Sequence, residues 1–207
     1  AAAHVDADMD VTGPMRLVAP SASHLPRYLA AAERGWSSQS ASMDPVSSAE
    51  ESALIHRDPV DFIDALNDPL HHGEPVTLPS GEQVPRLPSV RRWMWDGDYC
   101  GAISLRWQEG TMDLPPHCLG HIGYAVVPWK RRLGYATSAL AQMLVIARER
   151  GMSYVDIVTD VDNVPSQGVV LANGGVLVRE FTVPESQGGF AALLFRVSCD
   201  LGLPPVR

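Results

Sequence analysis

Cysteine and lysine are both scarce in this chain. Its 207 residues include three cysteines, Cys100, Cys118 and Cys199, and none of them has the spacing of a metal or redox motif. A sparse, odd set predicts buried, reduced thiols and a cytoplasmic protein. Lys130 is the single lysine and the formal net charge is −8, which argues against general nucleic-acid binding because that binding depends on excess Lys and Arg. The acidic balance weakly favours a cationic ligand.

Long apolar runs are also missing. No stretch approaches the roughly 18 residues that a membrane-spanning helix needs, and the first ten residues, "AAAHVDADMD", have no apolar core of the kind found in signal peptides. We therefore expect no membrane partner. Met15 opens a stretch that reads like the start of a domain. We expect residues 1–14 to be a disordered or added extension and residues 15–207 to form one domain.

Hydrophobic periodicity and turn residues predict a mixed α/β domain with helices on both faces of its sheet. The expected strands are 15–20, 90–95, 98–107, 120–127, 153–159, 176–183 and 190–198. The expected helices are one ending at Arg34 and capped by Ser21 or Ser23, then 58–67, 134–150 and 162–174. The polar segment 37–51 and the Pro- and Gly-rich segment 68–89 are expected to be loops, the second with a hairpin at Ser80-Gly81.

The densest basic cluster lies between a predicted strand and the longest predicted helix, and it consists of Lys130, Arg131 and Arg132. A helix start exposes unpaired N–H groups and a partial positive charge. Gly134 and Ala136 would let a ligand approach this backbone closely, and Thr137 adds a hydroxyl. These features predict a phosphate site. The alternative is a plain strand-to-helix turn with solvated basic side chains. The segment matches neither the P-loop nor the Rossmann glycine pattern.

A family resemblance joins this segment to two others. "RRLGYA", residues 131–136, resembles the [Q/R]-x-x-G-x-[G/A] signature of the GNAT acyltransferase superfamily, and "HIGYAVVP" before it resembles the splayed strand of that family. "DNVPSQGVVLANGG" resembles its later Asn-containing helix segment, with Asn163, Ser166 and Asn173-Gly174 in matching places. The resemblance covers roughly residues 98–198. "GHIGY" and "NGG" are similar to a poorly characterised bacterial branch of the superfamily.

The resemblance implies a mostly antiparallel central sheet of six to seven strands with one splayed pair. Acetyl-CoA, without a metal, would lie between strands 120–127 and 153–159, and residues 20–90 would face the acceptor. The residues that would contact acetyl-CoA are Tyr124, Val126, Val127, Arg131, Arg132, Leu133, Gly134, Tyr135, Ala136, Thr137, Asn163 and Ser166. Many family members pair through their sheet edges, so a homodimer is one expected arrangement.

The reaction implied is direct attack of a primary amine on the thioester. The backbone N–H of Val126 or Val127 would stabilise the oxyanion, and His121 would be the general base. An ordinary strand-end role for His121 is the alternative, and His117 is a second, less well placed candidate. Many family members carry a tyrosine as proton donor where this chain has Val170, which leaves the donor open.

Several alternatives remain at the level of sequence. The acceptor could be a small metabolite, an antibiotic-like polyamine, or a peptide or lysine amine. His71 and His72 could line its pocket or lie on an exposed loop. Because the expected tyrosine is missing, the chain could instead be a non-catalytic acyl-CoA-binding or regulatory module. A nucleotide-binding α/β protein of another kind is the third reading.

Overall fold

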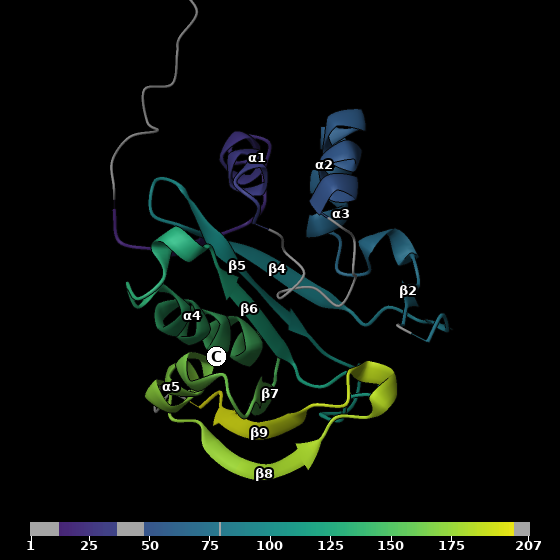
Figure 1. Cartoon of the computed structure of the whole chain (residues 1–207), viewed down its shortest axis with the longest axis vertical. Coiled ribbons are helices and arrows are strands. Elements are labelled where there is room, and N and C mark those ends of the chain that lie inside the picture. Colours follow the sequence, from purple (N-terminus) through teal and green to yellow (C-terminus); the bar gives the residue numbers. More distant parts are fainter. Residues whose placement is uncertain (1–12, 37–47, 79, 201–207) are drawn as a thin grey trace, which may run out of the picture.

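The computed structural model describes residues 13–36, 48–78 and 80–200, which form two antiparallel sheets and a small hairpin (Figure 1). The first sheet has the order β1 (Arg16–Val18), β4 (Ser89–Trp95), β5 (Tyr99–Arg106) and β6 (Ile122–Val126). The second has the order β7 (Tyr154–Asp160), β9 (Ala191–Ser198) and β8 (Val176–Thr182). The hairpin pairs β2 (Val76–Thr77) with β3 (Gln83–Val84). The prediction of a mixed α/β fold with mostly antiparallel strands is confirmed, but the seven main strands form two sheets.

Helices cover both faces of the first sheet, as predicted (Figure 1). One side carries α1 (Leu25–Glu33), α2 (Ser48–Arg57) and α3 (Pro59–Asn67), and the other carries α4 (Tyr135–Glu149), with α5 (Val164–Ala172) packed beside it. Successive side chains of a strand point to opposite faces. In β4, Trp93 accordingly packs with the core beneath α1 to α3, whereas Met94 packs with the core beneath α4. The tryptophans of this strand therefore serve the core.

Most of the local turn and cap signals are confirmed. Asp58 caps α3 by accepting a hydrogen bond from the Asp61 N–H at 2.9 Å, and Asp96-Gly97 turns the chain between β4 and β5. Gly151, with φ at 80°, follows the end of α4 in the left-handed conformation that favours glycine. The strong helix 134–150 was therefore located to within a residue at each end.

Two local predictions are wrong. The N-cap position of α1 is His24, not Ser21 or Ser23, and the His24 side chain makes no capping hydrogen bond. The Ser21 hydroxyl instead hydrogen-bonds the His24 ring at 2.9 Å. Helix α2 lies in a segment that was expected to be a loop. Its sequence is mostly polar and lacks a clear apolar stripe, so no periodic signal marked it. The rest of that predicted loop, residues 37–47, lies outside the described residues.

The two sheets meet at the beginnings of β6 and β7. The His121 N–H donates to the Asp156 carbonyl at 2.7 Å, and a Cβ atom at Gly120 would lie 3.0 Å from the same oxygen. A side chain at this position would push the two strands apart by a few tenths of an ångström, so glycine fits the contact best. Beyond it, no ladder joins β6 to β7 in the described part of the chain.

Two further findings bear on the expected setting of the protein. Cys100, Cys118 and Cys199 are all free and buried, as their sparse distribution predicted. Within the described residues, every helix is too short or too polar to cross a membrane.

Candidate functional site

The inner edge of β6 is unpaired where it faces β7. The Val127 N–H donates to the Cys100 carbonyl at 2.9 Å, and the Arg106 N–H donates to the His121 carbonyl at 2.8 Å. Main-chain groups of an antiparallel strand point alternately toward and away from its partner. The register therefore turns the N–H groups of Tyr124 and Val126 away from β5, toward the open edge. Of the two expected oxyanion donors, only Val126 has its N–H there. The expectation that the Val127 N–H could stabilise the oxyanion is wrong, because that N–H already donates to the Cys100 carbonyl.

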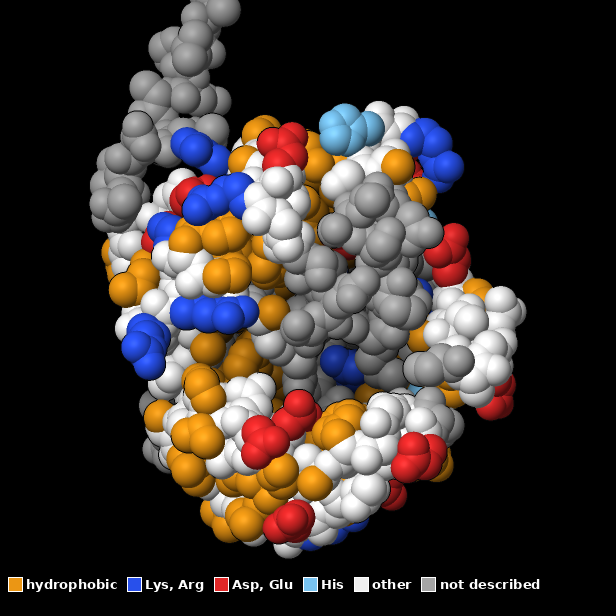
Figure 2. Space-filling view, viewed as in Figure 1, with side chains coloured by type: hydrophobic (Ala, Val, Ile, Leu, Met, Phe, Trp, Pro, Cys, Tyr) orange, Lys and Arg blue, Asp and Glu red, His pale blue; other side chains and the backbone are white. Residues whose placement is uncertain are grey.

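This open edge leads to the start of α4. Gly134, at φ 77°, forms the N-cap without any side-chain cap, and no atom lies within 4 Å of the position that its Cβ would occupy. The first N–H groups of α4, from Tyr135 to Thr137, are therefore not satisfied by a capping side chain. Arg132 also has a left-handed backbone, with φ at 64°. Basic side chains gather on the side of the molecule where this loop lies (Figure 2).

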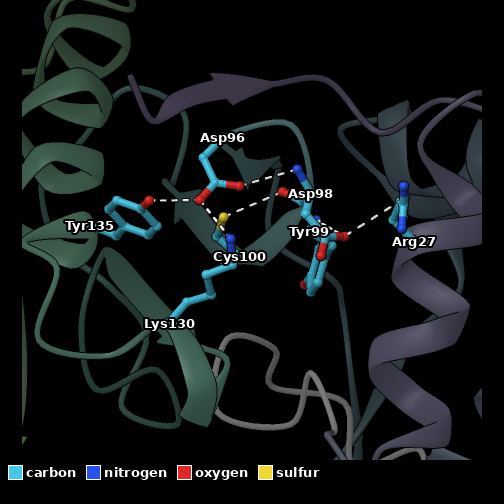
Figure 3. A network of polar contacts seen from close by, with 7 residues as sticks. All are labelled: Arg27, Asp96, Asp98, Tyr99, Cys100, Lys130 and Tyr135. Atoms are coloured by element: carbon cyan, nitrogen blue, oxygen red, sulfur yellow. Dashed lines mark hydrogen bonds and ion pairs between the residues drawn. The ribbon is translucent and has the colours of Figure 1, made fainter. Parts of the chain in front are cut away.

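The three basic residues of the loop have different roles. The Lys130 ammonium lies 2.7 Å from a carboxylate oxygen of Asp96, and the Tyr135 hydroxyl donates to the same oxygen at 2.6 Å (Figure 3). The Arg131 guanidinium donates to the Val126 carbonyl at 3.2 Å. Arg132 makes no hydrogen bond or ion pair with a described residue. The expectation that all three charges face an anion is corrected, because Lys130 anchors the loop to the β4–β5 turn.

Asp96 is the centre of that anchor, with 6% of its surface exposed. Burial on its own would raise the pKa of Asp96, but hydrogen bonds from Lys130 and Tyr135 outweigh it and hold the pKa below its ordinary value. The hydrogen bond to Asp96 in turn raises the pKa of Tyr135 to about 12. The ionised carboxylate therefore holds both partners across the neutral pH range.

Helix α5 closes the other side of the opening. Asn163 caps it by accepting from the Ser166 N–H at 3.2 Å, and the Tyr124 hydroxyl lies 2.8 Å from the Ser166 hydroxyl. Burial raises the pKa of Tyr124, so its phenol stays protonated at neutral pH. Asn173 donates to the Thr137 carbonyl at 3.2 Å and thereby ties α5 to α4. The structure thus brings Tyr124, Asn163 and Ser166 to the same opening.

His121 has no room to act as a base. Its ring is 1% exposed, Nδ1 accepts from the Asp156 N–H at 2.9 Å, and Nε2 donates to the Met112 carbonyl at 3.1 Å. Burial lowers its pKa, which favours this neutral form. Both ring nitrogens are occupied by main-chain groups. This geometry argues against His121 as the general base. It indicates instead that the His121 ring helps to hold the start of β6 against β7.

A cavity of about 240 Å³ opens on the opposite face of the first sheet. Its floor consists of side chains from β4 and β5, its walls come from α2, α3 and the β2–β3 region, and His72 and His117 line it. The side chain of His71 lies outside the described residues. The sequence analysis missed Arg91 and Arg106 on the floor, although strand alternation places them on the face shared by Trp93 and Ala102. No group of three potential metal ligands occurs in the part of the chain that the structure describes.

Comparisons with known proteins bear on the whole arrangement. A model of the Acetyltransferase (GNAT) family matches residues 61–174, more than half of the chain. The fold is similar to that of an acetyltransferase from Salmonella typhimurium that modifies the N-terminal serine of ribosomal protein L7/L12, with 17% identity and a TM-score of 0.55 over 92% of this chain and 98% of the other. It is also similar to the microcin C7 self-immunity acetyltransferase MccE, solved with acetyl-CoA and AMP, with 13% identity and a TM-score of 0.55 over 93% and 99%.

No curated protein matches the chain. The family match nevertheless includes the open strand, the left-handed turn and the start of α5 described above. The chain therefore belongs to the GNAT family and is an acetyl-CoA-dependent N-acetyltransferase.

Proposed function

We propose that the protein transfers the acetyl group of acetyl-CoA directly to a primary amine, with the donor held between β6, the start of α4 and α5. The observation that carries this proposal is the unpaired edge at Tyr124 and Val126, which continues into the uncapped turn at Gly134. The pantetheine arm would pair with that edge as an extra strand would. The pyrophosphate would accept from the N–H groups of residues 132–137, beside the Arg132 side chain, because the Arg131 N–H already donates to the Pro128 carbonyl.

In this proposal the amine attacks the thioester carbonyl, the C–S bond breaks, and the CoA thiolate leaves. The Val126 N–H donates to the developing oxyanion, a contribution typically worth about 10²–10³ in rate. The attacking amine must lose a proton and the thiolate gains one. We assign these two proton transfers to residues of this chain on chemical grounds.

We assign the base to His117 and the acid to Tyr124. The His117 ring lines the cavity and makes no hydrogen bond to another described residue, in contrast to His121. Imidazole is the commonest general base in enzymes. Tyr124 stands at the opening between β6 and α5 with its proton in place. Val170, where the family tyrosine would stand, is fully buried against Gly175 and has no role in proton transfer.

The test is release of CoA thiol from acetyl-CoA in the presence of a panel of primary amines. We expect His117→Gln to lower kcat by roughly 10²-fold or more and to remove one limb of the pH–rate profile. Tyr124→Phe should lower kcat with little change in the Kd of acetyl-CoA. His56→Gln, on the exposed surface of α2, is the matched control. Parent-like kcat values in both variants would exclude these assignments.

Calorimetry tests the binding of the donor separately from the chemistry. Heat of binding with acetyl-CoA, together with no thiol release for any amine of the panel, would contradict direct transfer to a primary amine. Thermal protection by ATP but not by acetyl-CoA would contradict the placement of acetyl-CoA between β6, α4 and α5.

A further inference from the structure

We propose that the acceptor amine carries an anionic group, a carboxylate or a phosphate, which is bound by Arg91 and Arg106 on the floor of the cavity. This inference rests on the proposed function, because it names the class of acceptor for the same reaction. It also reverses the weak expectation of a cationic acceptor, which came from the net charge of the whole chain.

The two arginines are neighbours on one face of the sheet. Arg91 of β4 pairs with Ser104 of β5, and Ser89 pairs with Arg106, so the two arginines occupy a diagonal position across the strands. Diagonal neighbours in an antiparallel pair lie about 7–8 Å apart, within reach of long side chains. The Ser104 hydroxyl accepts from Nε of Arg91 at 3.3 Å, which orients that guanidinium. Both arginines line the cavity, and both are only partly exposed.

Among the described residues, neither arginine has a carboxylate partner. No ion pair joins Arg91 or Arg106 to any described residue, although acidic residues stand in the cavity wall. The cavity is lined by five carboxylates, those of Glu51, Asp58, Asp61, Asp68 and Glu74, and the first four have other contacts. Glu51 accepts from the Tyr28 hydroxyl. Asp58 caps α3, and Asp61 and Asp68 each lie 3.3 Å from a ring nitrogen of His72.

Two like charges held side by side and partly buried repel each other unless an anion lies between them. Arginine also presents a planar fork of donors that matches carboxylate and phosphate. The unmatched charge of the cavity floor is therefore positive, in an otherwise acidic protein.

The strand register gives the spacing of the acceptor. Arg106 lies opposite the His121 position, and Tyr124 and Val126 are three to five residues farther along β6. At about 3.4 Å per residue this is roughly 10–17 Å, of which an arginine side chain spans part. The amine and the anionic group of the acceptor should therefore be separated by no more than roughly 17 Å. His117 lines the same cavity, in the segment that leads into β6.

The experiment measures how the KM of the acceptor depends on its charge and on its chain length. Linear ω-amino carboxylates with chains of increasing length are compared in the thiol-release assay with the corresponding ω-amino amides. Aminoalkyl phosphates are compared with aminoalkanols of the same length. We expect a KM at least about tenfold lower for the anionic members, with a best length, because a charged hydrogen bond is worth about one to two powers of ten. The series with the lower KM identifies the anion as carboxylate or phosphate.

Substitution of the floor then tests the contact. Arg91→Met and Arg106→Met should each raise the KM of the best anionic acceptor by about 10- to 100-fold and leave the KM of acetyl-CoA within twofold. The matched control is Arg16→Met, on the exposed edge of β1, which should behave as the parent does. If the Met variants fold poorly by circular dichroism, Arg91→Lys and Arg106→Lys keep the charge and should give a smaller loss of the same kind.

The inference fails if the parent does not discriminate between anionic and neutral amines, or if the arginine variants keep the parent preference. That failure is distinct from failure of the proposed function, which would show as no heat with acetyl-CoA or no thiol release. Where acetyl-CoA binds but no amine reacts, calorimetry of the same amine pairs, added to protein saturated with CoA, still measures the preference of the floor.

Discussion

Asp96 determines what the single lysine of this chain does. A lysine beside two arginines suggests a cluster that binds an anion. Lys130 and Tyr135 instead both contact the buried carboxylate of Asp96, which precedes them in the sequence by 34 and 39 residues. The role of His121 also depends on its tertiary contacts, because both of its ring nitrogens are hydrogen-bonded to main-chain groups of other segments. At the scale of single residues, the contacts that assign these roles are therefore long-range.

The Asp96–Lys130 pair should be coupled energetically. We expect Lys130→Met to destabilise the fold by about 1–3 kcal/mol, because it leaves a buried carboxylate with fewer partners. Asp96→Asn should also destabilise it. The double variant should lose less than the sum, with a coupling of at least about 0.5 kcal/mol, measured by urea unfolding. Additive losses would contradict the anchoring role of Lys130.

The pH dependence of the anchor follows from its pKa shifts. The pKa of Asp96 is lowered on folding, so its contribution is present above the ordinary carboxyl value of about 3.9 and is lost as the pH falls through the folded value. The pKa of Tyr135 is raised to about 12, so its contribution is present below about pH 10 and is lost as the pH rises toward that value.

We therefore expect the free energy that Tyr135→Phe costs to be constant between about pH 5 and 9 and to shrink on both sides. Urea unfolding of the parent and the variant across this range measures the difference. A cost that rises above pH 10 would have the wrong sign for this anchor.

At the scale of elements, helix α4 has a left-handed glycine at each end. Gly134 precedes it at φ 77° and Gly151 follows it at φ 80°, and both have open space where a Cβ would be. Their local conformations are alike. Only the first lies beside the open edge of β6, so the pair separates a ligand effect from a backbone effect.

We expect Gly134→Asn to weaken acetyl-CoA binding at least tenfold, because the new side chain would occupy the space left for the pyrophosphate. Gly151→Asn should bind acetyl-CoA as the parent does. Asparagine tolerates the left-handed conformation, so both variants should lose similar stability, about 1 kcal/mol or less. Calorimetry with acetyl-CoA and thermal unfolding measure the two effects. Equal binding by the two variants would remove the pyrophosphate from this turn.

At the scale of the whole molecule, the second sheet leaves an apolar edge exposed. Strand β8 lies at the edge of the order β7-β9-β8, and Val176, Leu177 and Val178 are 66%, 51% and 48% exposed. Unpaired edges of this kind tend to add another strand. In the antiparallel register that sets Arg179 of one β8 opposite Glu180 of the other, the two copies have complementary charges. This charge complementarity makes a second copy of the chain the expected partner.

We therefore expect a homodimer through β8. Sedimentation velocity should show a dimer for the parent and a monomer for Val176→Lys, with acetyl-CoA binding retained. The control is Val164→Lys, which is similarly exposed (67%) on α5 and should remain dimeric. A monomeric parent at micromolar concentration would exclude this interface.

Local patterns in the sequence were enough to locate the strands, the longest helix and the glycine turn before it, because periodicity, caps and glycine conformations are local properties. Its motifs also identified the family. The choice between the two main-chain amides depends on strand pairing, since the register of β5 and β6 bonds the Val127 N–H and turns the Val126 N–H toward the open edge. Tertiary contacts likewise pair Lys130 with Asp96 and hydrogen-bond both ring nitrogens of His121. They also bring Arg91 and Arg106 together on the floor of the cavity. Each of these depends on contacts between segments distant in the chain, which no local pattern encodes.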